Sequence, residues 1–85
     1  MNDPFINILP SIDVHGQTSD EACFYVDEFI NDSIKMGNKK IVIIHGIGTG
    51  VLKKTINAQF KRDKRISKMY GWGSNLGITI FELNI

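Results

Sequence analysis

The sequence is poor in several features that define whole classes of protein. Its single cysteine, Cys23, excludes an internal disulfide, and with only two histidines beside it a zinc cluster is disfavoured. Its apolar runs stay well below the roughly 18 residues that a membrane span needs, and no basic segment followed by an apolar run marks a signal peptide. It also lacks repeats and Pro/Ser-rich linkers. We therefore expect one cytoplasmic domain with a modest two-layer core.

Basic residues are missing from the first third of the chain. Residues 1–32 carry seven acidic side chains and no Lys or Arg, whereas residues 33–85 carry ten basic and two acidic side chains, a balance of 10 − 2 = +8. This polarisation favours an anionic partner that meets the basic part of the surface. The alternative is a solvated helix face whose charge is opposite to that of its neighbour.

The most informative stretch is residues 41–50, which read IVIIHGIGTG. The β-branched run predicts a strand buried on both faces, and the alternating glycines predict a sharp turn with outward-facing N–H groups. A helical spacing follows from Val51, and a strand, a glycine loop and a helix N-terminus together favour an anion site near Lys53 and Lys54. The alternative is an ordinary glycine-rich turn in which His45 only ends a strand.

The glycine loop matches neither of the common nucleotide fingerprints. It reads G-x-G-x-G, without the Gly-Lys-Ser/Thr ending of a phosphate loop, and Tyr70 stands where a dinucleotide site needs an acidic residue. A small-nucleotide-binding enzyme is therefore disfavoured.

Residues 11–16 alternate between apolar and polar side chains, which predicts a half-buried strand. Ile12 and Val14 are expected on one side, and Asp13 and His15 on the other. If this strand lies parallel to residues 41–44, His15 and His45 end in the same neighbourhood, at the edge where open α/β sheets place ligands. Taken alone, the segment could equally be an exposed sheet face with incidental polar residues.

The remaining patterns complete the fold prediction. Thr18 and Glu21 form a capping box before a helix that closes at Gly37. Its predicted buried stripe consists of Ala22, Val26, Phe29, Ile30 and Ile34, with Tyr25 alongside. A second helix is predicted over residues 51–63, and strands over 66–72 and 77–83 are expected to form an antiparallel hairpin with its turn at 74–75.

The element order β-α-β-α-β-β predicts an α/β two-layer sandwich, in which both helices cover one face of a four-stranded mixed sheet. Residues 1–10 are expected to be an N-terminal arm or a linker remnant, and residues 11–85 the domain itself.

Three segments together resemble the Smr (small MutS-related) domain family. IDVHG at residues 12–16, followed by Glu21-Ala22, resembles the family's LDLHG…EA. IHGIGTGVL at residues 44–52 resembles its hHGxGxGxLR, and Tyr70 with GITI at residues 77–80 resembles its closing GxTxV segment. The match covers about residues 9–83. It implies a fold similar to the C-terminal domain of translation initiation factor three.

The resemblance also implies an endonuclease that nicks DNA or cleaves RNA, in DNA repair and recombination control or in RNA and ribosome quality control. The partners it implies are DNA or RNA, a MutS2-type ATPase region in the same full-length chain, or the ribosome, and not a membrane. The alternative is a non-catalytic nucleic-acid-binding module attached to such an ATPase or to another partner.

The matched positions give a set of candidate site residues. Catalytic roles are predicted for Asp13, His15 and His45. The predicted phosphate- and nucleic-acid-binding residues are Gly46, Gly48, Thr49, Gly50, Lys53, Lys54, Tyr70 and Gly77. No metal ligands and no certain cofactor are predicted. Because Asp13 is the only carboxylate expected near the two histidines, we expect metal-independent or weakly metal-assisted cleavage, with RNA cut better than DNA, and a divalent metal stays an open alternative.

The chain departs from the family pattern at three places. Ile47 stands where many members have Lys, which removes a cation from the loop. Lys53 stands where Arg is usual, which keeps the charge but loses bidentate phosphate geometry. Residues 74–76 (Ser-Asn-Leu) replace glycines. These departures leave weaker activity, or a pure binding role, open.

Overall fold

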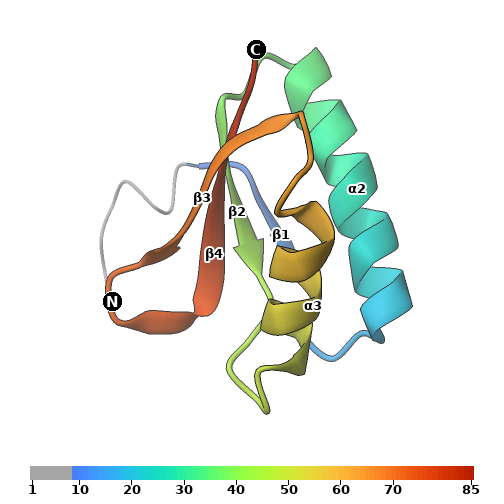
Figure 1. The fold of residues 1–85 in the computed structure, drawn as a ribbon, viewed down its shortest axis with the longest axis vertical. Coiled ribbons are helices and arrows are strands. Elements are labelled where there is room, and N and C mark those ends of the chain that lie inside the picture. The colour runs from blue at the N-terminus through green and yellow to red at the C-terminus, as the bar shows by residue number, and fades with distance from the viewer. Residues whose placement is uncertain (1–8) are drawn as a thin grey trace.

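The computed structural model describes residues 9–85, and the predicted element order is confirmed (Figure 1). The elements are β1 (Ser11–Asp13), α2 (Ser19–Lys35), β2 (Lys40–Ile44), α3 (Val51–Phe60), β3 (Ile66–Trp72) and β4 (Asn75–Leu83). The predicted N-terminal arm, residues 1–10, falls almost entirely outside the described residues. No helix in residues 9–85 is long and apolar enough to cross a membrane.

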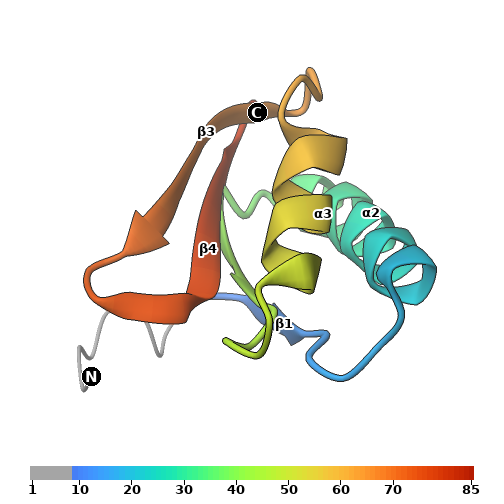
Figure 2. The same ribbon diagram turned by 60° about the horizontal axis from the view of Figure 1, so that its bottom comes forward.

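The four strands form one mixed sheet in the order β1-β2-β4-β3. β1 and β2 are parallel, with Asp13 opposite Ile44, whereas β4 is antiparallel to both of its neighbours. The predicted hairpin of β3 and β4 is confirmed, but its turn is residues 73–74 rather than 74–75. Because β1 and β2 run side by side in the same direction, the loops that follow them leave the sheet at the same edge (Figure 2).

Both helices cover one face of the sheet, as predicted (Figures 1 and 2). Alternate residues of β2 and β4 point between the sheet and the helices, and they pack there against the inner stripes of α2 and α3. The buried core consists of Val14, Ala22, Val26, Ile30, Ile41, Ile43, Ile56, Phe60, Phe81 and Leu83. Val42, which faces the other way, is also only 1% exposed, so the prediction of a central strand buried on both faces is confirmed.

The predicted caps of α2 are confirmed. The Glu21 N–H donates to Thr18 Oγ1 at 3.2 Å, and the Thr18 N–H donates to Glu21 Oε1 at 3.1 Å, so the capping box satisfies two backbone donors. At the other end Gly37 has a φ of +77°, and the N–H groups of Gly37 and Asn38 donate to the carbonyls of the last turn. The box fixes the point at which the chain turns from β1 into α2.

One side chain of the predicted α2 stripe is misplaced. Tyr25 is 46% exposed and lies edge-to-face against Phe24 on the outer side of the helix, so its placement beside the buried stripe was wrong. Ser33 is buried instead. Residues 22, 26, 30 and 33 recur at the spacing of three and four residues that places them on one face of the helix.

Two elements are shorter than predicted, and in each case an aspartate explains where the chain leaves its regular structure. β1 ends at Asp13 rather than near residue 16, because the Asp13 carboxylate accepts the backbone N–H of His15 at 3.1 Å. α3 ends at Phe60 rather than at residue 63, and beyond it the Asp63 carboxylate accepts the backbone N–H of Arg65 at 2.9 Å. Short polar side chains compete with regular backbone pairing in this way.

Arg65 ties the turn before β3 to the outer face of α2. Its guanidinium donates to both carboxylate oxygens of Asp63, to Asp27 Oδ1 at 2.7 Å and to Asn31 Oδ1 at 2.9 Å. The hydrogen bonds from Arg65 hold the pKa of Asp63 below its usual value. Part of the charge asymmetry of the sequence is therefore balanced inside the domain.

Candidate functional site

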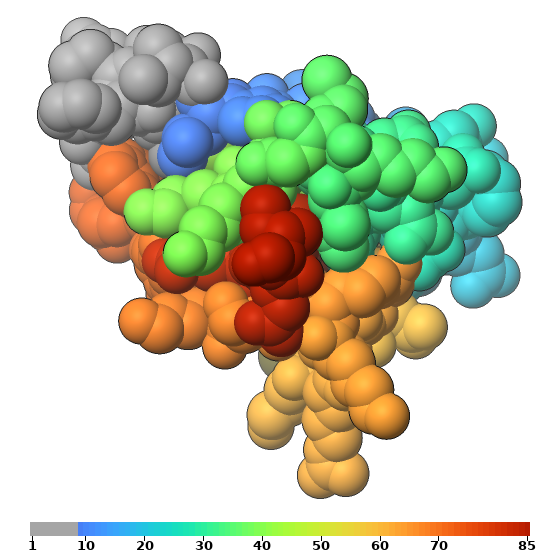
Figure 3. Space-filling model, turned by 90° about the horizontal axis from the view of Figure 1, so that it is seen from above, coloured from blue at the N-terminus to red at the C-terminus, as the bar shows by residue number. Residues whose placement is uncertain are grey.

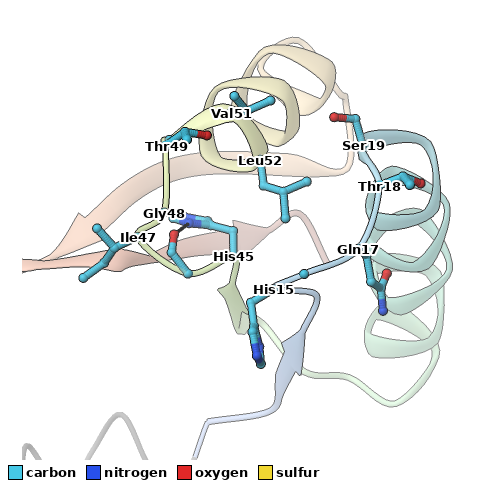
Figure 4. A pocket seen from close by; sticks show the side chains of 13 residues that line it. His15, Gln17, Thr18, Ser19, His45, Ile47, Gly48, Thr49, Val51 and Leu52 are labelled. Carbon is cyan, nitrogen blue, oxygen red and sulfur yellow. Dashed lines mark hydrogen bonds between the residues drawn. The ribbon is translucent and has the colours of Figure 1, made fainter.

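A cleft of about 510 Å³ opens where the loops after β1 and β2 meet (Figure 4). Residues 15–19 line one wall, and residues 45–52, which contain the glycine loop and the first two residues of α3, line the other. The parallel pairing of β1 with β2 brings the two walls together. His15 and His45 both line this cleft, as expected if the two strands ran side by side.

Asp13 and His15 form a hydrogen-bonded pair beside the cleft. The Asp13 Oδ1 atom accepts both the backbone N–H of His15 and the ring Nδ1–H, the latter at 2.5 Å. The side-chain bond from His15, reinforced by the backbone bond, lowers the pKa of Asp13. Because Nδ1 donates to the carboxylate, the neutral imidazole keeps its free lone pair on Nε2.

The His15 ring is accessible. Its side chain is 69% exposed, and it points out of the cleft, away from α3 (Figure 4). A general base needs a defined tautomer, a free nitrogen and access to the reacting group. The pair of Asp13 and His15 supplies all three at the mouth of the cleft.

His45 is held very differently. It is only 3% exposed, its Nδ1 lies 3.0 Å from the Gly46 carbonyl oxygen, and its Nε2 lies 2.9 Å from Thr79 Oγ1. A carbonyl only accepts, so Nδ1 donates, and in the neutral ring Nε2 accepts from the Thr79 hydroxyl. Both ring nitrogens are engaged with the protein. His45 thereby connects the glycine loop to β4, and its predicted catalytic role stays a prediction.

Replacing Thr79 tests this support. Thr79→Val keeps the shape of the side chain but leaves Nε2 of a buried imidazole without a partner. We expect the free energy of unfolding to fall by about 1–3 kcal/mol, the cost of an unsatisfied buried polar group. Thr79→Ser retains the hydroxyl and is the matched control. Urea unfolding measures both, and equal stability of the Val and Ser variants would contradict the bond seen here.

The glycine loop has the conformation that only glycine adopts readily. Gly46, Gly48 and Gly50 have φ values of +77°, +37° and +81°. Gly50 is the N-cap of α3 and has no side-chain cap, and helical bonding begins with the Lys54 N–H donating to the Gly50 carbonyl at 3.0 Å. The N–H groups of residues 51–53 thus precede the helical ladder, at the positive end of the helix dipole. Thr49 is exposed in this loop. The predicted succession of strand, glycine loop and helix N-terminus is present, and anion binding there stays a prediction.

Gly77, in β4, packs against the glycine loop and bonds to it. Its carbonyl oxygen accepts the N–H groups of His45 and Gly46 at 3.0 and 3.1 Å, and a Cβ at Gly77 would lie 3.4 Å from the Gly46 backbone. Gly77 is buried. Its position fits close packing of β4 under the loop, and the predicted contact with nucleic acid stays a prediction.

The other predicted binding residues lie away from the cleft. Lys53 and Lys54 line a second groove on the outer side of α3, and neither lines the cleft. Tyr70 lies within β3, opposite Ile80 of β4, and its hydroxyl donates to Glu82 Oε2. Burial, with help from Glu82, raises the pKa of Tyr70 to about 12. Among the residues described, the cleft lining contains no Lys or Arg.

Sequence reasoning missed two residues of the site. Gln17 lines the cleft, and its buried Oε1 has no hydrogen-bond partner in the described part of the chain. No sequence signal points to it. Thr79 bonds His45 across 34 positions of sequence, and the only hint was its place in the glycine-rich closing segment.

The fold and the site define a two-layer α/β domain that carries a glycine-rich loop beside an aspartate–histidine pair. The Smr domain model matches residues 12–78, so this chain belongs to the Smr domain family. The predicted resemblance and fold class are confirmed.

The similar proteins are much longer than this chain. The chain is 42% identical over 81 residues to endonuclease MutS2 of Caldicellulosiruptor bescii, covering 91% of this chain and 10% of that protein. It is 41% identical over 71 residues to endonuclease MutS2 of Finegoldia magna, covering 84% and 9%. The chain thus spans about a tenth of the length of these curated relatives.

A solved structure gives the same picture. The crystal structure of the Smr domain of Thermus thermophilus MutS2 matches with a TM-score of 0.88 and 28% identity, over 91% of this chain and 100% of that one.

Proposed function

We propose that this domain is an Smr-type endonuclease that cleaves the phosphodiester backbone of nucleic acid, and RNA better than DNA. The observation that carries the proposal is the oriented pair of Asp13 and His15 directly beside the glycine loop. A Cβ at Gly46 would lie 3.1 Å from the His15 Cβ, so the base and the loop are in immediate contact. The names of the MutS2 relatives, which describe endonucleases, support the same reaction class.

In this mechanism the loop and the start of α3 bind backbone phosphates through their N–H groups. The reacting phosphate lies at the mouth of the cleft, within reach of His15 Nε2. In RNA, His15 takes the proton of the 2′-hydroxyl as its oxygen bonds to phosphorus. The bond from phosphorus to the 5′-oxygen breaks, that oxygen takes a proton from water, and the His15 imidazolium then returns its proton to the solvent. Asp13 holds the tautomer and stabilises the imidazolium that forms. His45 positions the loop.

DNA has no 2′-hydroxyl, so water would have to attack, normally with help from a cation. The described residues fit a metal poorly, because no three His, Cys, Asp or Glu side chains come together in residues 9–85 and the Asp13 carboxylate is already bonded to His15. The proposed mechanism therefore uses no metal ion.

End-group analysis of cleavage products tests the chemistry. With RNA we expect 2′,3′-cyclic or 3′-phosphate ends, and we expect a chelator to spare most of the cleavage. Matched DNA of the same sequence should be cut much less. Products with 3′-hydroxyl and 5′-phosphate ends, made only with a divalent metal, would instead point to metal-assisted DNA nicking.

A non-catalytic binding module is the second candidate. It is favoured by one observation: Ile47, 64% exposed, stands in the cleft lining where many family members have Lys, and within residues 9–85 no Lys or Arg lines the cleft. Less charge is then available near a reacting phosphate. Binding of RNA without any cleavage would support this role.

The relatives also suggest where the domain works and with which partners. We propose that the domain works in the cytoplasm on DNA or RNA, either joined to a MutS2-type ATPase region or at the ribosome. Repair and recombination control, or RNA quality control, would then be its biological context.

A further inference from the structure

A second groove, of about 500 Å³, runs along the outer side of α3 beside β3. It shares no lining residue with the cleft, but the two adjoin along the sequence of α3: Val51 and Leu52 line the cleft, and Lys53 and Lys54 line the groove. The groove is lined by Lys53, Lys54, Asn57, Ala58, Lys61 and Met69.

The groove has the chemistry of a site for an extended anion. Three of its six lining residues are lysines and none is acidic. Lys53, Asn57 and Lys61 follow one another at intervals of four residues, a rise of about 6 Å per step, which resembles the separation of successive phosphates along an extended strand. The Oδ1 atom of Asn57 is buried without a hydrogen-bond partner in the described part of the chain, and as an acceptor it suits a ribose hydroxyl rather than a phosphate oxygen. Ala58 and Met69 add an apolar lining that a sugar or a base can contact.

The positive charge available to a nucleic-acid strand lies in the groove rather than in the cleft. The cleft is lined by His15 and the glycine loop, with Asp13 beside it, yet its lining has no Lys or Arg among the described residues. Lys53 and Lys54 lie in the first turn of α3 and Lys61 at its C-cap, and Arg62 and Lys64 are exposed just beyond it. The chain near the end of α3, in amber and orange, projects from the surface seen in Figure 3.

We propose that this groove binds the sugar–phosphate backbone of the strand that flanks the phosphates held by the glycine loop. The inference rests on the proposed function. From Val51 to Lys61 the helix rises by about 15 Å, enough for only a few nucleotides. The domain therefore recognises a stretch of strand that runs from the mouth of the cleft over the loop and along α3, rather than one phosphate.

The test compares two pairs of substitutions that remove the same charge. Lys54→Gln with Lys61→Gln removes two groove lysines. Lys35→Gln with Lys39→Gln removes two exposed lysines that line neither the groove nor the cleft. Binding of a single-stranded RNA of about 12 nucleotides, within the usual site sizes, is measured as a function of salt, with a DNA of the same sequence as a second arm.

For the groove pair we expect the log–log salt slope to become shallower by about 1.4, since each lost contact with a single strand changes it by about 0.7. Cleavage of the 12-nucleotide RNA should slow more than cleavage of a trinucleotide. The control pair should leave slope and length dependence unchanged. Equal slopes for the two pairs, with RNA still bound and cut by the unaltered domain, would overturn the groove while leaving the proposed function standing. Failure of the unaltered domain to bind either RNA or DNA would overturn both.

Discussion

His15→Ala is expected to reduce RNA cleavage by about 10²- to 10⁴-fold, the usual contribution of a general base. The effect should be confined to chemistry, because the side chain is 69% exposed and its ring bonds only to Asp13 among the described residues. Binding of RNA and the free energy of unfolding should therefore stay close to their original values. Single-turnover cleavage with saturating protein, together with a binding titration, separates the two quantities.

Asp13→Asn extends this test to the partner. The amide can donate to Nδ1, which would move the ring proton to Nε2 and remove the free lone pair from the reacting side. Cleavage should fall with binding retained. Normal cleavage by both variants would exclude His15 as the base and return the role to His45, which would then have to release the bond to Thr79.

Gly46→Ala is expected to lower the rate of cleavage by about 10²-fold. A loss of that size is typical when a catalytic group is displaced by about 1 Å. The new Cβ would lie 3.1 Å from the Cβ of His15, so the base and the loop must move apart. The positive φ of +77° adds a cost of about 1–2 kcal/mol in stability.

Gly37→Ala is the matched control for that substitution. Gly37 has the same φ of +77°, lies at the far end of α2, and a Cβ there meets nothing within 4 Å. Both variants should lose similar stability in urea unfolding, but only Gly46→Ala should lose activity. A loss of activity that merely tracks the loss of stability in both would mean that contact with His15 is not what makes Gly46 necessary.

Local patterns were sufficient for the secondary structure and for one half of the site. The alternation of Ile12, Asp13, Val14 and His15 predicted that the carboxylate and the imidazole share one side, two residues apart. They do lie together, although the strand ends at Asp13 and the hydrogen bonds between His15 and Asp13 hold the pair. The capping box of α2 likewise involves groups only three residues apart. Such features depend on dihedral angles and short spacings, and they need no knowledge of the rest of the fold.

The second half of the site depends on contacts that are distant in sequence. Whether His45 is exposed or buried is decided by β4, which brings Thr79 to Nε2 across 34 positions. The pairing of β3 with β4 brings the Tyr70 hydroxyl to Glu82, a contact that the sequence did not indicate, and its contact with nucleic acid stays a prediction. The alternation within each strand indicates which of its side chains share a face, but which partner side chain each one meets depends on how the strands pair.

By itself, then, the sequence determined the element order, the two-layer architecture, the aspartate–histidine pair and the glycine loop, because each follows from local spacing or from motifs shared with the Smr family. Only the tertiary structure decided that His45 is a buried support and that Lys53 and Lys54 lie outside the cleft. The helical pattern says which residues of α3 share a face, but the direction of that face is set by how α3 docks on α2 and on the sheet. That docking directs Ile56 and Phe60 into the core and leaves the lysines along the groove beside Met69.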